Sequence, residues 1–131
     1  MEYLIGICLA LTVSVFANRV GFDRDRAFYP TVLIVVASYY GLFAVIGGSN
    51  QALAAELIAM AAFVSASVVG FKRSLWIVAA ALVAHGIFDL FHGYLIFNAG
   101  MPAWWPMFCM SYDVTAGAWL AWFLSRSRRS T

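Results

Sequence analysis

The sequence predicts an all-α, polytopic membrane protein, folded as a single domain of five transmembrane helices over residues 1–131. Two observations carry this prediction. First, 64% of the residues are hydrophobic and only 11% are charged, which is far from the composition of soluble domains. Second, the apolar residues form five runs, each long enough to cross about 30 Å of hydrocarbon as a helix. These runs cover residues 3–20, 28–47, 51–70, 75–97 and 103–124.

Short breaks separate the five runs. They read DRDR (23–26), GGSN (47–50), FKRS (71–74) and NAGMP (98–102), and segments rich in charge, Gly, Asn or Pro are typical of helix ends and turns. Pro30 and Pro106 fall near the first turn of the second and fifth helices, where a missing N–H costs little. No Lys or Arg precedes the first run, so we expect a retained helix and not a secretion signal.

The basic residues predict the orientation. They fall in or beside the first and third breaks and in the tail, and the second and fourth breaks have none. Since these positions share one side of the membrane, the positive-inside tendency predicts the N-terminus outside and the C-terminus in the cytoplasm. We expect a bacterial inner membrane protein whose main partner is the lipid bilayer, with no nucleic-acid partner. The eight basic residues that predict this orientation are Arg19, Arg24, Arg26, Lys72, Arg73, Arg126, Arg128 and Arg129.

The segment AHGIFDLFHGYLIFN (84–98) places ionisable residues inside an apolar run. His85, Asp89 and His92 are spaced by four and three residues, so they share one face of the fourth helix. A charged Asp at the bilayer centre costs roughly 2.5 to 3.5 kcal/mol, so such residues are usually paired and face a bundle interior. Glu56 on the third helix is expected about one and a half turns below the outer surface and Asp113 on the fifth nearer the middle, so both share the outer half with the helix-four residues. The sequence therefore predicts an intramembrane His/Asp site near the outer face.

The residue types at this site favour a divalent metal, with zinc, iron, manganese or copper as candidates. Asp89, His92 and Asp113 are the predicted ligands, and His85 and Glu56 are predicted as further ligands or as hydrogen-bond partners of the ligands. His85 and His92 are about 10.5 Å apart along the helix axis, too far to bind one ion easily. As an enzyme, the protein would activate water and use His85 and Asp89 as catalytic residues on a lipophilic substrate.

Three other interpretations of the same residues stay open. The polar side chains can be hydrogen-bonded packing between helices, with no further role. They can form the pathway of a proton- or ion-coupled small transporter, which with five spans would need a homo-oligomer. The chain can also be a non-catalytic subunit of a larger membrane complex, in keeping with its small size and short loops.

The two cysteines and the start of the fifth helix allow two interpretations each. Cys8 and Cys109 are expected to be small packing residues, and a disulfide between them is the alternative because they are expected at comparable depths in the outer half of the membrane.

Trp104 and Trp105 are expected to anchor the fifth helix at the membrane interface. Alternatively, Trp105 forms a wall over the polar site, because it shares a face with Cys109 and Asp113 at four-residue spacing.

Small residues on the fourth and fifth helices predict close helix packing. We expect Gly86, Gly93 and Gly117 to allow it, because glycine lets two backbones approach within a membrane.

The C-terminal half also resembles a known family. The pattern His85-xxx-Asp89-xx-His92, a loop with Pro102 and Pro106, and Asp113 in the last helix resembles small bacterial integral membrane proteins of unknown function. The resemblance covers roughly the last 50 residues and implies the same His and Asp site residues. In that family a Cys directly precedes the aspartate, whereas Cys109 here precedes Asp113 by four. Membrane zinc hydrolases of the ceramidase type are similar in architecture only, since they also hold His and Asp within a helix bundle.

Overall fold

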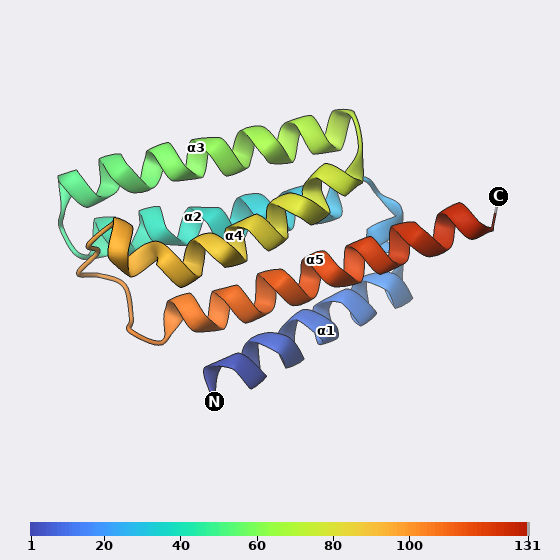
Figure 1. Cartoon of the computed structure of the whole chain (residues 1–131), viewed down its shortest axis with the longest axis horizontal. Coiled ribbons are helices and arrows are strands. Elements are labelled where there is room, and N and C mark those ends of the chain that lie inside the picture. Colours follow the sequence, from blue (N-terminus) through green and yellow to red (C-terminus); the bar gives the residue numbers. More distant parts are fainter. Residues whose placement is uncertain (131) are drawn as a thin grey trace.

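The computed structural model describes residues 1–130 and contains the five predicted helices. Successive helices run in opposite directions, so α1, α3 and α5 start at one end of the bundle and α2 and α4 at the other (Figure 1). No strand occurs within the described residues, which confirms the all-α prediction. The helices are α1 (Glu2–Val20), α2 (Phe28–Ile46), α3 (Asn50–Lys72), α4 (Leu75–Leu95) and α5 (Trp105–Arg129), and a short 3-10 helix, η1 (Phe22–Arg24), joins α1 to α2.

Local sequence explains where several helices begin and end. Ser49 and Ser74 precede α3 and α4, and each accepts a hydrogen bond from a backbone N–H in the first turn. The distances are 3.1 Å from Ala52 N and 3.3 Å from Trp76 N. Such N-caps satisfy donors that have no partner inside the helix. α1 ends at Gly21, whose φ of 95° is a left-handed conformation that costs glycine little.

The helix packing places α4 at the centre of the bundle. α4 contacts α2, α3 and α5, and α1 packs against α5 (Figure 1). A Cβ atom at Gly86 would lie 2.8 Å from Val114 Cγ2, and one at Gly117 would lie 2.9 Å from the backbone oxygen of Ala79. The predicted close-packing role is therefore confirmed for Gly86 and Gly117. It is wrong for Gly93, where a Cβ atom would have open space.

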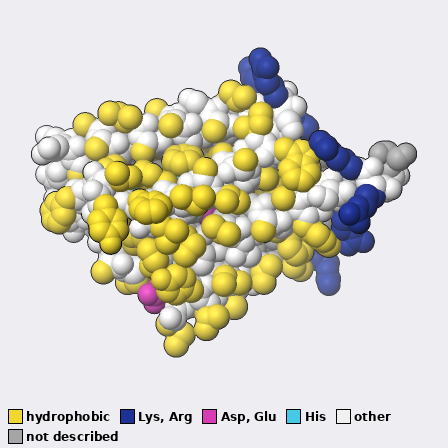
Figure 2. Space-filling model, viewed as in Figure 1, with side chains coloured by type: hydrophobic (Ala, Val, Ile, Leu, Met, Phe, Trp, Pro, Cys, Tyr) yellow, Lys and Arg dark blue, Asp and Glu magenta, His cyan; other side chains and the backbone are white. Residues whose placement is uncertain are grey.

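Four of the helices, α1 to α4, are long and apolar enough to cross a membrane. α5 falls outside this group because Asp113 and its tryptophans lower its hydropathy, so the fifth span stays a prediction. Hydrophobic side chains cover much of the face seen in Figure 2, and Lys and Arg side chains gather at one end of it. That end carries the last turns of α1, α3 and α5.

Candidate metal centre

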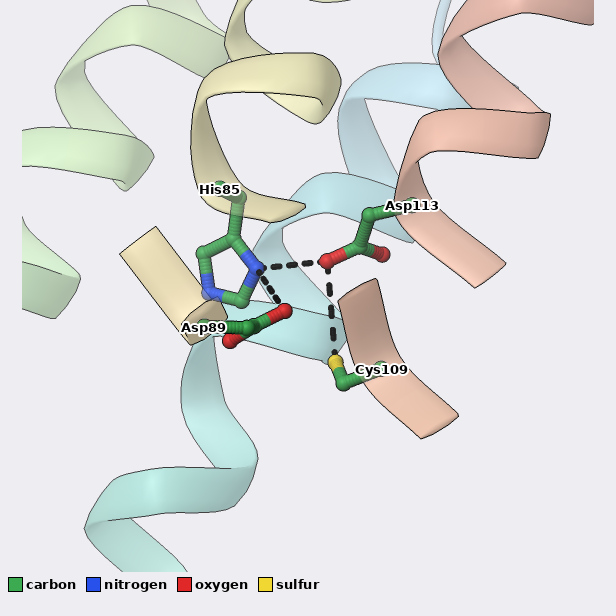
Figure 3. Close-up of side chains that lie close together, drawn as sticks. All are labelled: His85, Asp89, Cys109 and Asp113. Atoms are coloured by element: carbon green, nitrogen blue, oxygen red, sulfur yellow. Dashed lines mark hydrogen bonds and ion pairs between the residues drawn. The ribbon is translucent and has the colours of Figure 1, made fainter. Parts of the chain in front are cut away.

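Four side chains with metal-binding atoms meet between α4 and α5, and they point toward one another (Figure 3). His85 and Asp89 lie one turn apart on α4, and Cys109 and Asp113 have the same spacing on α5. Residues four apart share a helical face, so two facing pairs on adjacent helices are enough to form this cluster. One donor atom from each side chain lies within 4.8 Å of those of the other three. We call these four residues the metal-site cluster.

His85 joins the two carboxyl groups of the cluster. Its Nδ1 lies 2.6 Å from Asp113 Oδ2, which is a short hydrogen bond. The same nitrogen lies 3.6 Å from Asp89 Oδ2, which is an ion-pair distance but too long for a hydrogen bond. Cys109 Sγ lies 3.6 Å from Asp113 Oδ2, with the thiol as donor. The imidazole, both carboxyl groups and the thiol therefore form one connected group.

The cluster is closed off from its surroundings. His85 and Asp89 are each 1% exposed, Asp113 is 0% exposed and Cys109 is 2% exposed. Two of its carboxyl oxygens, Asp89 Oδ2 and Asp113 Oδ1, are buried with no hydrogen-bond partner among the described residues. A buried carboxylate oxygen without a partner is costly, and within residues 1–130 these two aspartates form ion pairs with His85 alone.

The donor types fit a divalent cation. Imidazole nitrogen, thiolate sulfur and carboxylate oxygen are the ligands that zinc uses in proteins, and iron and copper accept the same mixture. Asp89 Oδ2, which lacks a hydrogen bond, faces the cluster and would gain a partner from a bound cation (Figure 3). The residues present therefore fit a metal ion in both chemistry and charge.

Tyr40 of α2 contacts the cluster from a third helix. Its hydroxyl donates a hydrogen bond to Asp89 Oδ1 at 2.6 Å, and the side chain is 2% exposed. Its ring also stacks on the imidazole of His92, with ring centroids 4.0 Å apart. Tyr40 thus fixes one oxygen of Asp89 and leaves the other oxygen directed to the cluster.

A second buried polar group lies at the end of α4. His92 Nε2 lies 2.7 Å from Glu56 Oε1 of α3, and Asn98 donates to the same oxygen at 2.9 Å. Asn98 also donates to the backbone oxygen of Tyr40 at 3.0 Å. His92 and Glu56 are 0% and 1% exposed. We call His92, Glu56 and Asn98 the outer polar cluster, following the predicted orientation.

The structure therefore divides the predicted ligand set in two. Asp89, Asp113 and His85 meet in the metal-site cluster, which Cys109 completes. His92 and Glu56 pair with each other in the outer polar cluster and are not among the four grouped residues. The reason is the helix geometry, since His92 follows His85 by seven positions, which places the two side chains two turns apart. The side chain of Glu56 faces the interior of the bundle, where it pairs with His92, and the sequence alone does not predict this orientation.

No family model, no curated protein and no solved structure matches the chain. The resemblance of the C-terminal half to small bacterial membrane proteins therefore stays a prediction, and the functional argument depends on the site's own residues.

Two members of these clusters, Tyr40 and Asn98, are absent from the residues that the sequence singles out. Tyr40 and Asn98 were not candidates, because a tyrosine in an apolar helix and an asparagine in a break have ordinary structural roles. Cys109 packs in the hydrophobic core, as expected, and its four-residue spacing to Asp113 also places its sulfur in the metal-site cluster. The alternative of a disulfide is wrong in this structure, since both Cys8 and Cys109 are free, the first exposed and the second buried.

Proposed function

We propose that the protein is a multi-pass membrane protein that binds one divalent metal ion through His85, Asp89, Cys109 and Asp113. The observation that carries this proposal is the meeting of four donor atoms within 4.8 Å in a buried site. Such a grouping inside an apolar bundle is costly unless it is neutralised, and a divalent cation neutralises two carboxylates at once. The mixture of nitrogen, sulfur and oxygen donors favours zinc or iron over manganese.

We also propose that the centre is catalytic and acts on a lipophilic substrate. A divalent ion held there would supply Lewis-acid activation of water. Activation of water requires an open position on the ion, so in the catalytic form three of the four donors would hold it and the fourth would take up a proton. His85 and Asp89 are the two candidates for the proton acceptor, since they lie 3.6 Å apart at the cluster. Tyr40 would hold Asp89 in place through its hydroxyl, and the surrounding apolar helices would exclude bulk water.

The proposed setting is the bacterial inner membrane, with five spans, the N-terminus outside and the C-terminus in the cytoplasm. The gathering of Lys and Arg at one end of the bundle supports this orientation (Figure 2). With it, the metal-site cluster lies in the outer half of the membrane, because Cys109 is on the second turn of α5. Fluorescence of a reporter fused to the C-terminus, compared with a reporter that requires export, tests the orientation.

One observation favours a second candidate function, a proton- or ion-coupled transporter. Tyr40 connects the metal-site cluster to the outer polar cluster through its hydroxyl, its ring and its backbone oxygen. Titratable groups linked in this way occur along proton pathways in membranes. Proton flux into liposomes that contain the purified protein would support the transporter, whereas turnover in detergent without a gradient would support the enzyme.

Metal analysis of the protein purified in detergent tests the leading proposal. We expect one zinc or iron ion per chain in the parent protein and a large loss in Asp113→Asn. His92→Gln is the matched control, because His92 is equally buried but lies in the outer polar cluster. A parent protein without zinc, iron, manganese or copper would overturn the metal centre. Equal loss in both variants would overturn the ligand assignment.

A further inference from the structure

A large apolar cavity of about 790 Å³ lies between α1, α2 and the start of α5. Leu9 of α1, Val32 and Val35 of α2, and Trp105 and Cys109 of α5 line it. Its volume is within the range of sites that bind small molecules, about 300 to 1,000 Å³. We call this cavity the α1–α2 groove.

The helix packing explains why the groove exists. α1 packs against α5 through small residues, and α2 packs against α3 and α4. The space between α1 and α2 therefore stays open above the surface of α5. The small residues of α1 are Gly6, Ala10, Ser14 and Ala17.

The lining of the groove selects a hydrocarbon ligand. Among the described residues that line the groove, Asp25, at the end near η1, is the only charged one, and the rest of the wall is mostly apolar. Leu9 and Val35 are 43% and 45% exposed on opposite walls, so the groove opens on the apolar surface of the bundle. From Phe28 to Tyr39 the α2 wall extends about 16 Å, long enough for much of a lipid chain.

The groove reaches the metal-site cluster at one residue. Cys109 lines the groove, and its sulfur lies 3.6 Å from Asp113 Oδ2. Trp105, one turn earlier on α5, also lines the groove, and its Nε1 is buried without a hydrogen-bond partner among the described residues. A buried indole N–H without an acceptor points to a ligand that supplies one. The apolar groove and the unpaired N–H of Trp105 therefore both lie beside the metal-site cluster.

We propose that the α1–α2 groove binds one acyl chain of a membrane lipid, with the polar linkage of that lipid beside Trp105 and Cys109. The assignment of this lipid as the substrate rests on the proposed metal centre, whereas the binding of the chain does not. Trp105 donates to the polar linkage, and the chain extends along Val32 toward Phe28. Tyr39, which also lines the groove, packs edge-on against Trp105 with ring centroids 5.0 Å apart and so supports that indole.

Photolabelling tests the groove in the full-length protein. The protein is reconstituted in phosphatidylcholine vesicles that contain phosphatidylcholine with a diazirine in the middle of one acyl chain, and the labelled residues are identified by mass spectrometry. We expect labelling at Val13 and Val32 to exceed that at Ile58, which is 76% exposed on α3 but outside the groove. Labelling that follows exposure alone, or cross-links to a second copy of the chain at the groove, would overturn the proposal.

Two variants fill the groove from its exposed edges and so avoid disturbing the core. Leu9→Trp and Val35→Trp should each lower groove labelling roughly tenfold, which corresponds to about 1.4 kcal/mol of binding free energy. Ile58→Trp is the matched control and should leave groove labelling unchanged. Unchanged labelling in both groove variants would overturn the proposal.

Metal content measured on the same samples separates the two proposals. Groove labelling without bound metal would overturn the metal centre and the role of the lipid as substrate, and would retain the lipid site. Bound metal with labelling that follows exposure would overturn the lipid site alone.

Discussion

The ring of Tyr40 lies flat against the imidazole of His92, with centroids 4.0 Å apart and an angle of 14° between the planes. The same side chain donates its hydroxyl to Asp89 at 2.6 Å, so one residue of α2 links the two buried polar clusters on α4. α2 therefore helps to position Asp89, a proposed metal ligand.

Removal of the Tyr40 hydroxyl should destabilise the protein. Tyr40→Phe keeps the stacked ring but leaves Asp89 Oδ1 without its donor, and we expect a loss of about 2 kcal/mol in the free energy of unfolding. Denaturant unfolding in detergent micelles measures this loss. Tyr39→Phe is the control, since that neighbouring tyrosine lines the α1–α2 groove and should be near neutral. Equal effects of the two substitutions would contradict the assigned role of Tyr40.

The outer polar cluster should be structural with respect to the metal. Glu56→Ala removes the acceptor shared by His92 and Asn98, and we expect a loss of about 3 kcal/mol in the free energy of unfolding. Glu56→Gln retains an acceptor oxygen and should lose clearly less. Both variants should keep the metal content of the parent protein. A loss of metal in Glu56→Gln would place Glu56 among the ligands after all.

The contact between α1 and α5 should be sensitive to side-chain size at Gly6. A Cβ atom there would meet Ser111 Oγ and would lie 2.5 Å from the backbone oxygen of Phe108. Gly6→Val should therefore force the helices apart and lower the free energy of unfolding by about 1 to 3 kcal/mol. Gly93→Ala, where a Cβ atom has open space, is the matched control. If the two variants have equal stability, α1 does not pack on α5 as described.

Much of the metal-site cluster was predictable because helical periodicity fixes which residues share a face. His85 and Asp89 lie four apart, and the cost of a charge in hydrocarbon directs both toward neighbouring helices. Asp113 was predictable as their partner because it is an acidic residue at matching depth on the next helix. Cys109 shares its face, but its residue type is equally common in packing, so its spacing alone did not decide its role.

The remaining contacts depend on tertiary structure that the sequence pattern does not encode. Tyr39 and Tyr40 are adjacent in an apolar helix, yet one lines the groove and the other bonds to Asp89. The helix is apolar on all sides, so periodicity does not choose between them. Asn98 lies in a loop and would be expected in solvent, but it is 6% exposed because the loop folds back over Tyr40 and Glu56. The separation of His92 from the metal-site cluster follows from the two helical turns between it and His85, but its pairing with Glu56 of α3 depends on the tertiary structure.

The absorption spectrum of the cobalt-substituted protein tests the central claim most directly, since it reports whether sulfur binds the ion. The purified protein is stripped of metal and titrated with Co²⁺ in detergent. We predict a thiolate-to-cobalt charge-transfer band in the parent and in Cys8→Ser, the other cysteine of the chain, and its loss in Cys109→Ser. Failure to bind Co²⁺, or the same spectrum in Cys109→Ser as in the parent, would contradict the proposed centre.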